Sequence, residues 1–169
     1  FGIHSLNHAV EKILHGKGQI SVHTPWYNHR PVMLTVNDYS LRLYNGDVGI
    51  VLPEDAAHQH DDTAKRVWFQ EPGGNFRSLS PSRLHATQTS YAMTVHKSQG
   101  SEFDHVLLVL PPSVTDTSSR LLTRELLYTA VTRARSRVTI LGSTEVVSYM
   151  AVNPTRRASG LRNLLWSGR

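Results

Sequence analysis

The sequence predicts an α/β fold that carries a small inserted antiparallel β-barrel, because two parts of the chain have different patterns of apolar residues and turn residues. Residues 105–110 (HVLLVL) and 137–142 (RVTILG) are apolar runs without alternation, and a helical pattern over residues 123–135 separates them. Strands that are apolar on both faces belong inside a parallel sheet covered by helices, and strand, helix, strand in this order is a βαβ unit. Residues 47–85 instead show short strands divided by turn residues, which is typical of a small antiparallel barrel.

The N-terminal third supplies a helix and then strands. Residues 3–14 (IHSLNHAVEKIL) have apolar side chains at helical spacing, followed by Gly16 and Gly18, which predict the end of the helix. Residues 31–36 (PVMLTV) predict a buried strand, and residues 45–52 (NGDVGIVL) predict a turn and a strand. The pair Asn45-Gly46 provides the positive φ that a tight turn needs.

The middle of the chain predicts a hairpin and an exposed loop. Residues 66–70 and 75–79 flank the sequence EPGG, which is a hairpin pattern. Residues 53–65 are polar and predict a loop, whereas residues 91–95 (YAMTV) predict a further strand. We therefore expect an SH3-like barrel within an α/β domain, followed by a tail, with these bounds: 1–46 and 86–152 for the α/β domain, 47–85 for the barrel and 153–169 for the tail.

Composition restricts the chemistry. The 169 residues are 39% hydrophobic, carry a formal net charge of +5 and include no cysteine. The absence of cysteine excludes disulfides, thiolate zinc sites and a cysteine nucleophile, and it fits a cytoplasmic location. The basic charge suits nucleic acid, although many proteins without that partner are mildly basic. The sequence begins at Phe1 rather than Met, so we expect a fragment.

The segment TVHKSQGSEFDHV, residues 94–106, gathers hydroxyl, imidazole, ammonium, amide and carboxylate groups next to a predicted strand. Loops at the ends of such strands face the ligand crevice of α/β folds, and these groups can contact phosphates, sugars and bases. A polar surface loop would have the same composition.

A second segment, residues 123–138, predicts a helix with one apolar face and an adjoining polar stripe made of Glu125, Thr129, Thr132 and Arg133. An arginine beside a crevice can neutralise the charge of a transferring phosphoryl group, as an arginine finger does. The alternative is a solvated basic helix face.

Together these two segments resemble a known family. TVHKSQGSEF is similar to motif V of superfamily 1 DNA helicases, and LLYTAVTRAR is similar to their motif VI; we call residues 94–103 the motif V segment and residues 126–135 the motif VI segment. NDYSLRLYNGDVG (37–49), WYNHRPVM before it and the tail RRASGL resemble the RecD-like branch. The resemblance implies a RecA-like second motor domain, without its own phosphate loop, that carries an SH3-like insert.

The resemblance also implies roles for nucleotide-site residues. Arg133 resembles the arginine that contacts the γ-phosphate of ATP, and it would be catalytic. Glu102 resembles the carboxylate that holds the ribose, and Gln99 and Gly100 resemble the turn that links the nucleotide and DNA sites.

The DNA contacts that the resemblance implies lie in the motif V segment and at one position before the predicted barrel. They are Thr94, His96, Lys97, Ser98 and Asn37. For Asn37 and Asn45 the resemblance leaves two roles open, at the DNA channel or in shaping turns, and for Asn45 we favour the turn.

The resemblance implies ATP and Mg²⁺ as cofactors, single-stranded DNA as a partner, and RecB and RecC as partner subunits in exodeoxyribonuclease V, which acts in the repair of double-strand breaks. The activity implied is ATP-dependent 5′-to-3′ helicase activity. The chain contains no G-x-x-x-x-G-K-[ST] phosphate loop and no acidic pair for Mg²⁺, so we expect the fragment alone to be inactive. The alternatives are a stand-alone RecD-like helicase, a relaxase-helicase, and a non-catalytic DNA-binding adaptor.

Two groups of histidines and acids have spacings that could bind metal. His4, His8, Glu11 and His15 follow one another along the first predicted helix, and His58, His60, Asp61 and Asp62 lie in the polar loop. Such spacing is more often an exposed helix face or a solvated loop, so we expect no metal site.

Overall fold

A computed structural model describes residues 2–54 and 65–155. The chain divides into two compact units, Phe1–Lys97 and Ser98–Arg169, which we call unit 1 and unit 2.

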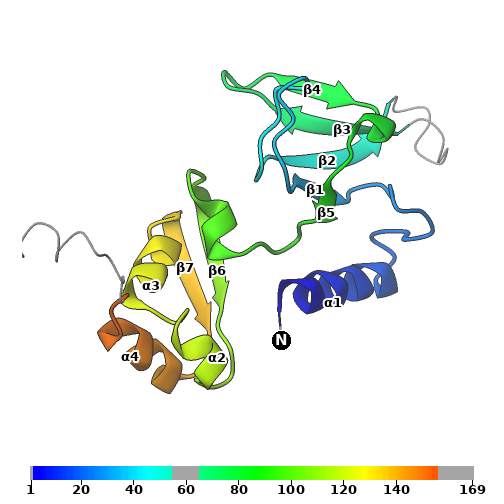
Figure 1. Cartoon of the computed structure of the whole chain (residues 1–169). Helices are drawn as coiled ribbons and strands as arrows, with labels where there is room; N and C mark the ends of the chain where they lie inside the picture. Colours follow the sequence, from blue (N-terminus) through cyan, green and yellow to red (C-terminus); the bar gives the residue numbers. More distant parts are fainter. Residues whose placement is uncertain (1, 55–64, 156–169) are drawn as a thin grey trace, which may run out of the picture. The chain divides into compact units, whose positions relative to one another are not determined.

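Unit 1 consists of a helix and a five-stranded antiparallel sheet (Figure 1). The strand order is β4-β3-β2-β1-β5, so the last strand lies beside the first. In chain order the elements are α1 (Ile3–Gly16), β1 (Pro31–Leu34), β2 (Val48–Pro53), β3 (Lys65–Gln70), β4 (Phe76–Leu79), the 3₁₀ helix η2 (Pro81–Arg83), β5 (Thr87–Thr89) and the 3₁₀ helix η3 (Val95–Ser98).

The predicted helix, turn and hairpin are confirmed in unit 1. Helix α1 covers the predicted residues 3–14, and Gly46 has the positive φ, +103°, that the turn before β2 requires. Strands β3 and β4 form the hairpin across the EPGG turn, which is closed by a 2.8 Å hydrogen bond from the Glu71 amide to the Asn75 carbonyl.

The core of unit 1 comes from the alternate side chains that face inward along these strands. Strand β3 alternates buried and half-buried residues, as the period of two requires. The core cluster is Val32, Leu34, Leu41, Leu43, Val51, Val67, Phe69, Leu79 and Leu84. Gly49 faces this core, because a Cβ there would come within 2.8 Å of the side chains of Val67 and Phe69.

The antiparallel sheet extends beyond both ends of the predicted range 47–85. Strand β1 pairs with β2 and with β5, both antiparallel. The predicted strand at 31–36 therefore belongs to this sheet and not to the parallel one. This strand is buried by packing within the antiparallel core. A run of apolar residues predicts burial, but it does not show whether the strand packs in such a core or between helices.

The prediction of a strand at residues 91–95 is wrong, and the reason is a side chain from helix α1. Asn7 is buried, with 7% of its surface exposed. Its Nδ2 donates to the Ala92 carbonyl at 3.0 Å, and its Oδ1 accepts from the Ala92 amide at 2.9 Å. Both backbone polar groups of Ala92 are thus satisfied by one carboxamide in place of a neighbouring strand.

Unit 2 contains the predicted βαβ unit. Its elements are β6 (Phe103–Val109), α2 (Asp116–Ser119), α3 (Arg124–Val131), β7 (Ala134–Leu141) and α4 (Thr144–Val152). Strands β6 and β7 pair in parallel. The hydroxyls of Thr115, Thr123 and Ser143 cap the three helices by accepting a backbone N–H, as N-cap residues do.

Two predictions for unit 2 are corrected. The helix predicted over 123–135 ends at Val131, and residues 134–137 belong to β7, because the β-branched run that follows favours a strand. The two apolar strands are not fully buried: Leu107 and Leu141 are about 60% exposed, since the sheet has two strands in the described part of unit 2 and therefore two open edges.

Some predicted features lie outside the described residues, namely most of the loop 53–65 with its histidines and the tail from residue 156. Among the described helices, none has the length and the apolar character needed to cross a membrane.

Replacing Asn7 tests its role as a surrogate strand partner. We expect Asn7→Ala to lower the free energy of unfolding by about 1–3 kcal/mol, because it leaves both backbone polar groups of Ala92 without a protein partner. Denaturant unfolding followed by the fluorescence of Trp26 and Trp68 measures this. Asn75→Ala is the control, because Asn75 is exposed in the hairpin turn and its loss should cost under about 0.5 kcal/mol. Equal effects of both substitutions would contradict this role.

Candidate nucleotide and DNA site

The boundary between the two units falls inside the motif V segment. Residues up to Lys97 belong to unit 1, and residues from Ser98 belong to unit 2. The candidate nucleotide residues Gln99, Gly100, Glu102 and Arg133 therefore lie in unit 2, and four of the five candidate DNA residues lie in unit 1.

Arg133 joins the two motif segments within unit 2. It lies in the turn between α3 and β7 and is half-buried. Its Nη1 donates to the carbonyl of Ser101 at 3.2 Å, and its Nε donates to the carbonyl of Thr129 at 3.3 Å. Its own carbonyl accepts from the Phe103 amide at 2.8 Å. One arginine thus fixes the motif V turn against the end of the motif VI helix.

Glu102 is paired with an arginine that the sequence did not single out. Its Oε2 lies 3.1 Å from Nε of Arg135, and both side chains are more than half exposed. A helix through residue 135 would have pointed Arg135 away from the motif V segment, but the strand β7 places it beside Glu102. Because an exposed ion pair contributes little, at most about 1 kcal/mol, the carboxylate can exchange this partner for another one.

The turn between Ser98 and Glu102 has the geometry that its sequence predicts. Gly100 has a φ of +88°, which favours glycine, and the Ser101 amide donates to the Ser98 carbonyl at 3.0 Å. Gln99 is exposed, whereas Ser98 is buried with 7% of its surface accessible. The turn therefore presents the Gln99 side chain and the peptide of Gly100 to solvent.

The polar stripe predicted on helix α3 is used for local structure. The Thr129 hydroxyl donates to the Glu125 carbonyl at 2.8 Å, and the Thr132 hydroxyl donates to the Tyr128 carbonyl at 3.0 Å. The Glu125 carboxylate accepts from the amide and the hydroxyl of Thr155, at 2.9 and 2.8 Å. Hydrogen bonds from its own amide and from Thr155 lower the pKa of Glu125 to about 2.

In unit 1, the motif V segment lies against the loop between β1 and β2. Thr94 and His96 are exposed. The ammonium of Lys97 donates to the side-chain carbonyl of Asn45. Asn37 Oδ1 accepts from the Asn45 amide at 2.8 Å. Asn37 therefore shapes the turn, and Asn45 both belongs to the turn and contacts the motif V segment.

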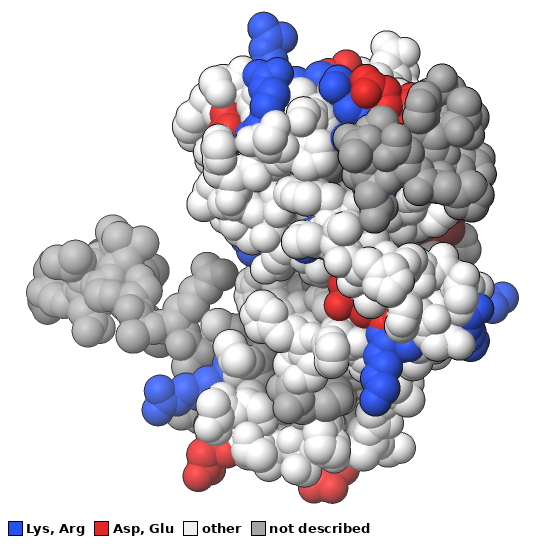
Figure 2. Space-filling view, turned by 90° about the vertical axis from the view of Figure 1, so that its right-hand side faces the viewer, with Lys and Arg blue, Asp and Glu red and all other residues white. Residues whose placement is uncertain are grey.

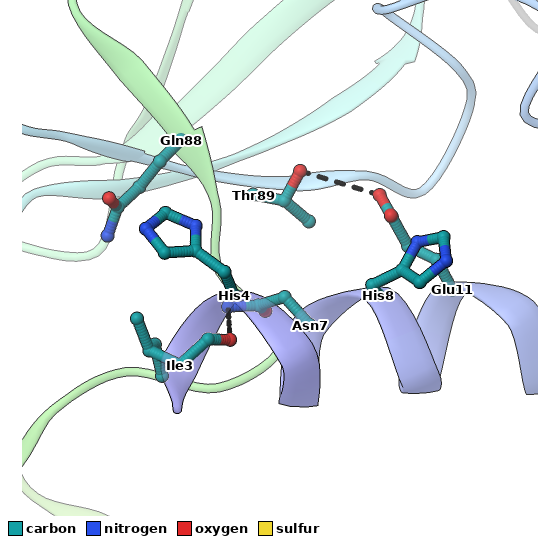
Figure 3. Close-up of a pocket in the computed structure, with 7 residues that line it drawn as sticks. All are labelled: Ile3, His4, Asn7, His8, Glu11, Gln88 and Thr89. Carbon is teal, nitrogen blue, oxygen red and sulfur yellow. Dashed lines mark hydrogen bonds between the residues drawn. The ribbon is translucent and has the colours of Figure 1, made fainter. Parts of the chain in front are cut away.

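A small open pocket in unit 1 lies away from these residues. It has a volume of about 160 Å³ and is lined by side chains of α1 and β5 (Figure 3), namely Ile3, His4, Asn7, His8, Glu11, Gln88 and Thr89. Within the described residues no group of three or more histidine, cysteine or acidic side chains is arranged to hold a metal ion. Glu11 is instead occupied by hydrogen bonds from the hydroxyls of Tyr27 and Thr89, at 2.5 and 3.4 Å.

The positive charge of the chain is not gathered on the face shown in Figure 2. Lysine and arginine side chains there stand in separate groups, some of them beside aspartate or glutamate and others among uncharged residues.

Sequence reasoning missed the contact of Arg135 with Glu102 and that of Asn45 with Lys97. Arg135 was assigned to a helix, so its partner across the turn could not be inferred. For Asn45 the turn was favoured over the DNA channel, and the contact of its side chain with Lys97, 52 residues later, was not foreseen. Neither contact leaves a signal in a single sequence, because each depends on the tertiary path of the chain.

A family model describes part of the chain. Residues 89–141, which include both motif segments, match the UvrD-like helicase C-terminal domain.

Curated relatives match most of the chain. RecBCD enzyme subunit RecD of Mycobacterium tuberculosis is 45% identical over 85% of this chain and 23% of its own length. The RecD subunit of Mycolicibacterium smegmatis is 39% identical over 97% of this chain and 27% of its own length. The ATP-dependent RecD2 DNA helicase of Deinococcus radiodurans is 34% identical over 84% of this chain and 18% of its own length. The chain thus spans about a quarter, or less, of the length of these relatives.

Among solved structures, Bacteroides Pif1 bound to single-stranded DNA is similar with a TM-score of 0.46 and 19% identity, over 95% of this chain and 43% of that chain.

The carboxyl group of Glu125 gives a test of the unit 2 geometry. A lowered pKa means that the ionised form stabilises the fold above the ordinary pKa of 4.5, and that this contribution is lost as the pH falls through about 2. We expect a carboxyl NMR titration to give a pKa near 2. Thr155→Val should raise it, whereas Thr155→Ser, which keeps the hydroxyl, should not. An unchanged pKa in Thr155→Val would contradict the assigned hydrogen bonds.

Proposed function

We propose that this chain, a member of the RecD family of superfamily 1 DNA helicases, forms one wall of the ATP site in a motor that moves 5′ to 3′ on single-stranded DNA. The observation that carries the proposal is the Arg133 guanidinium, which joins the motif VI turn to the motif V carbonyl of Ser101. A side chain in this place can couple the binding and hydrolysis of ATP to the position of the motif V segment, which is proposed to face DNA.

The proposed architecture is a RecA-like second motor domain with an inserted SH3-like barrel. The parallel pair β6 and β7, with helices between them in the chain, supports the first part. Five short antiparallel strands, with η2 between β4 and β5 and with β5 beside β1, support the second. We accordingly extend the proposed barrel from residues 47–85 to include β1 and β5. The remaining residues of 1–46 and 86–152 are assigned to the proposed motor domain.

The nucleotide would be held from this side by Arg133 and Glu102. ATP supplies the phosphoanhydride whose hydrolysis drives the motor. The guanidinium has five N–H donors, and its bonds to the two carbonyls use Nε and Nη1, so the donors on Nη2 suit a γ-phosphate. Glu102 would accept from the ribose hydroxyls after releasing Arg135, and the Gln99–Gly100 turn would border the same site. We place the ligands of Mg²⁺ in another domain, because the acidic pair is absent from this chain.

The DNA path would follow the exposed part of the motif V segment. Thr94 and His96 are exposed and can contact phosphates. Lys97 is held by Asn45, so it would act from a fixed position. Asn37 would contribute by shaping the loop, and Ser98 through its backbone, because its side chain is buried.

The similarity to RecD subunits at 39–45% identity favours a role within exodeoxyribonuclease V, with RecB and RecC as partners. As part of the same proposal, we place this complex in the cytoplasm. The 34% identity to the RecD2 helicase supports the alternative of a helicase that acts alone. Co-purification of the full-length protein with RecB and RecC decides between the two.

Arg133 is the residue on which the motor proposal depends. In the full-length protein we expect Arg133→Ala to reduce ATP turnover about 10³-fold or more, because an arginine finger acts on the transition state. Arg133→Lys should rescue poorly, since an ammonium lacks the planar fork. Steady-state ATPase assays with saturating DNA measure this, and single-stranded DNA affinity should change little.

The matched control is Arg137→Ala. Arg137 is exposed and lies on β7 opposite His105 of the parallel neighbour, so it makes no contact with the motif V turn. Arg135 is unsuitable as a control because it pairs with Glu102. Equal losses for Arg133→Ala and Arg137→Ala would favour a solvated basic surface and count against the arginine finger.

The proposed DNA path predicts that affinity for single-stranded DNA falls as salt rises. Each phosphate contact releases counterions, with a slope of about −0.7 per contact in a plot of log K against log salt. In the full-length protein, Lys97→Gln should reduce the magnitude of this slope by roughly 0.7, measured by fluorescence anisotropy. A slope identical to that of the unmodified protein would exclude Lys97 from the path.

A further inference from the structure

The loop between β1 and β2, residues 35–47, carries two exposed tyrosine rings. Tyr39 is 74% exposed and Tyr44 is 52% exposed. The two rings lie edge to face, with centroids 6.3 Å apart and an interplanar angle of 78°. This geometry is favourable for an aromatic pair, and it leaves most of both rings accessible to another aromatic group.

The loop that carries the rings is internally fixed. Asp38 and Leu43 exchange backbone hydrogen bonds of 2.7 and 2.9 Å. The Asp38 carboxylate accepts from the Ser40 hydroxyl at 2.7 Å and from the Leu41 amide at 3.0 Å. Leu41 and Leu43 are buried in the core of unit 1. Binding to the rings would therefore cost little ordering of the loop, which is the condition for a preorganised site.

Two cations and two carboxylates lie near the rings. Arg42 lies between the two tyrosines in the sequence and is exposed, with a φ of +50°. Lys97 is held at the same loop through Asn45. Asp38 and Asp47 also belong to the loop; both keep their negative charge and accept hydrogen bonds from neutral groups of the loop, with Asp47 Oδ2 accepting from the Tyr44 amide at 2.8 Å.

The loop also adjoins the segment proposed to face DNA, and this relation lies wholly within unit 1. The Lys97 contact brings the end of η3 to Asn45, next to Tyr44. A strand that followed Thr94 and His96 would therefore reach a surface with aromatic rings and cations together. Stacking of bases on aromatic side chains beside a cationic groove is how proteins bind single strands without reading sequence.

We propose that Tyr39 and Tyr44 form a stacking site for the bases of single-stranded DNA. This inference rests on the proposed function, and it adds a base-binding element to a path otherwise made of phosphate contacts. The alternative is that another part of the full-length protein packs against these rings. The experiment below distinguishes that packing from the stacking of DNA bases.

The test uses the full-length protein, oligo(dT) and an oligonucleotide of the same length with abasic sites. We expect Tyr39→Ala and Tyr44→Ala each to weaken oligo(dT) binding by roughly fivefold or more, and to change the affinity for the abasic strand by less than twofold. The salt slope should stay unchanged, because no phosphate contact is removed. Tyr39→Phe and Tyr44→Phe keep the ring and should keep the affinity.

The control for exposed aromatic surface is Phe76→Ala, since Phe76 is 64% exposed on β4. It should leave both affinities unchanged. A 2-aminopurine base in the strand gives a second readout: its fluorescence should be quenched on binding to the unmodified protein and much less on binding to the alanine variants.

The outcomes separate this inference from the proposed function. If the unmodified protein binds no single-stranded DNA, the proposed function itself fails. If it binds, and the alanine variants bind oligo(dT) equally well, the stacking site is wrong while the function stands. Equal weakening on oligo(dT) and on the abasic strand would mean that the rings pack against another part of the protein, which also overturns the inference.

Discussion

The path of the chain out of the antiparallel sheet depends on one buried carboxamide. After β5 the backbone has no further strand to pair with, and the Asn7 side chain supplies both a donor and an acceptor to the backbone of Ala92. A second bond, from Nδ2 to the Ile3 carbonyl at 3.0 Å, anchors the same amide to its own helix. Because Ala92 stands two residues before Thr94, this contact fixes where the motif V segment begins. An apolar side chain at residue 7 could not do this, since it would leave buried backbone groups unsatisfied.

The end of helix α3 has a comparable influence in unit 2. The helix stops at Val131, and this early end places Arg133 in a turn and Arg135 on a strand. From the turn, the guanidinium of Arg133 reaches the Ser101 carbonyl, and from the strand, Arg135 reaches Glu102. The two arginines therefore have different environments, although they are only two residues apart in the sequence. One bonds to backbone carbonyls and is half-buried, and the other forms an exposed ion pair that a ligand can replace.

The polar residues of the β1–β2 loop show how structural and binding roles divide. Asp38 and Asn37 direct their oxygens to backbone amides, so these side chains maintain the turn. The groups left on the surface are two aromatic rings, Tyr39 and Tyr44, together with the exposed cation Arg42. The loop thus presents to solvent two aromatic rings and a cation, which are kinds of group that bind single strands.

The sequence by itself determined the local elements and the two motif segments. Periodicity predicted α1, and the glycine-containing turns predicted the β3–β4 hairpin and the turn before β2, because these features depend on neighbours within a few residues. The order of motif V and motif VI, with an apolar strand between them, indicated the resemblance to superfamily 1 DNA helicases. Tertiary structure alone decided which sheet β1 joins, why residues 91–95 form no strand, and where Arg135 points. These features depend on contacts such as Asn7 with Ala92, 85 residues apart, and on competition between helix and strand at residue 134. A single sequence contains no pattern for partners that only folding brings together.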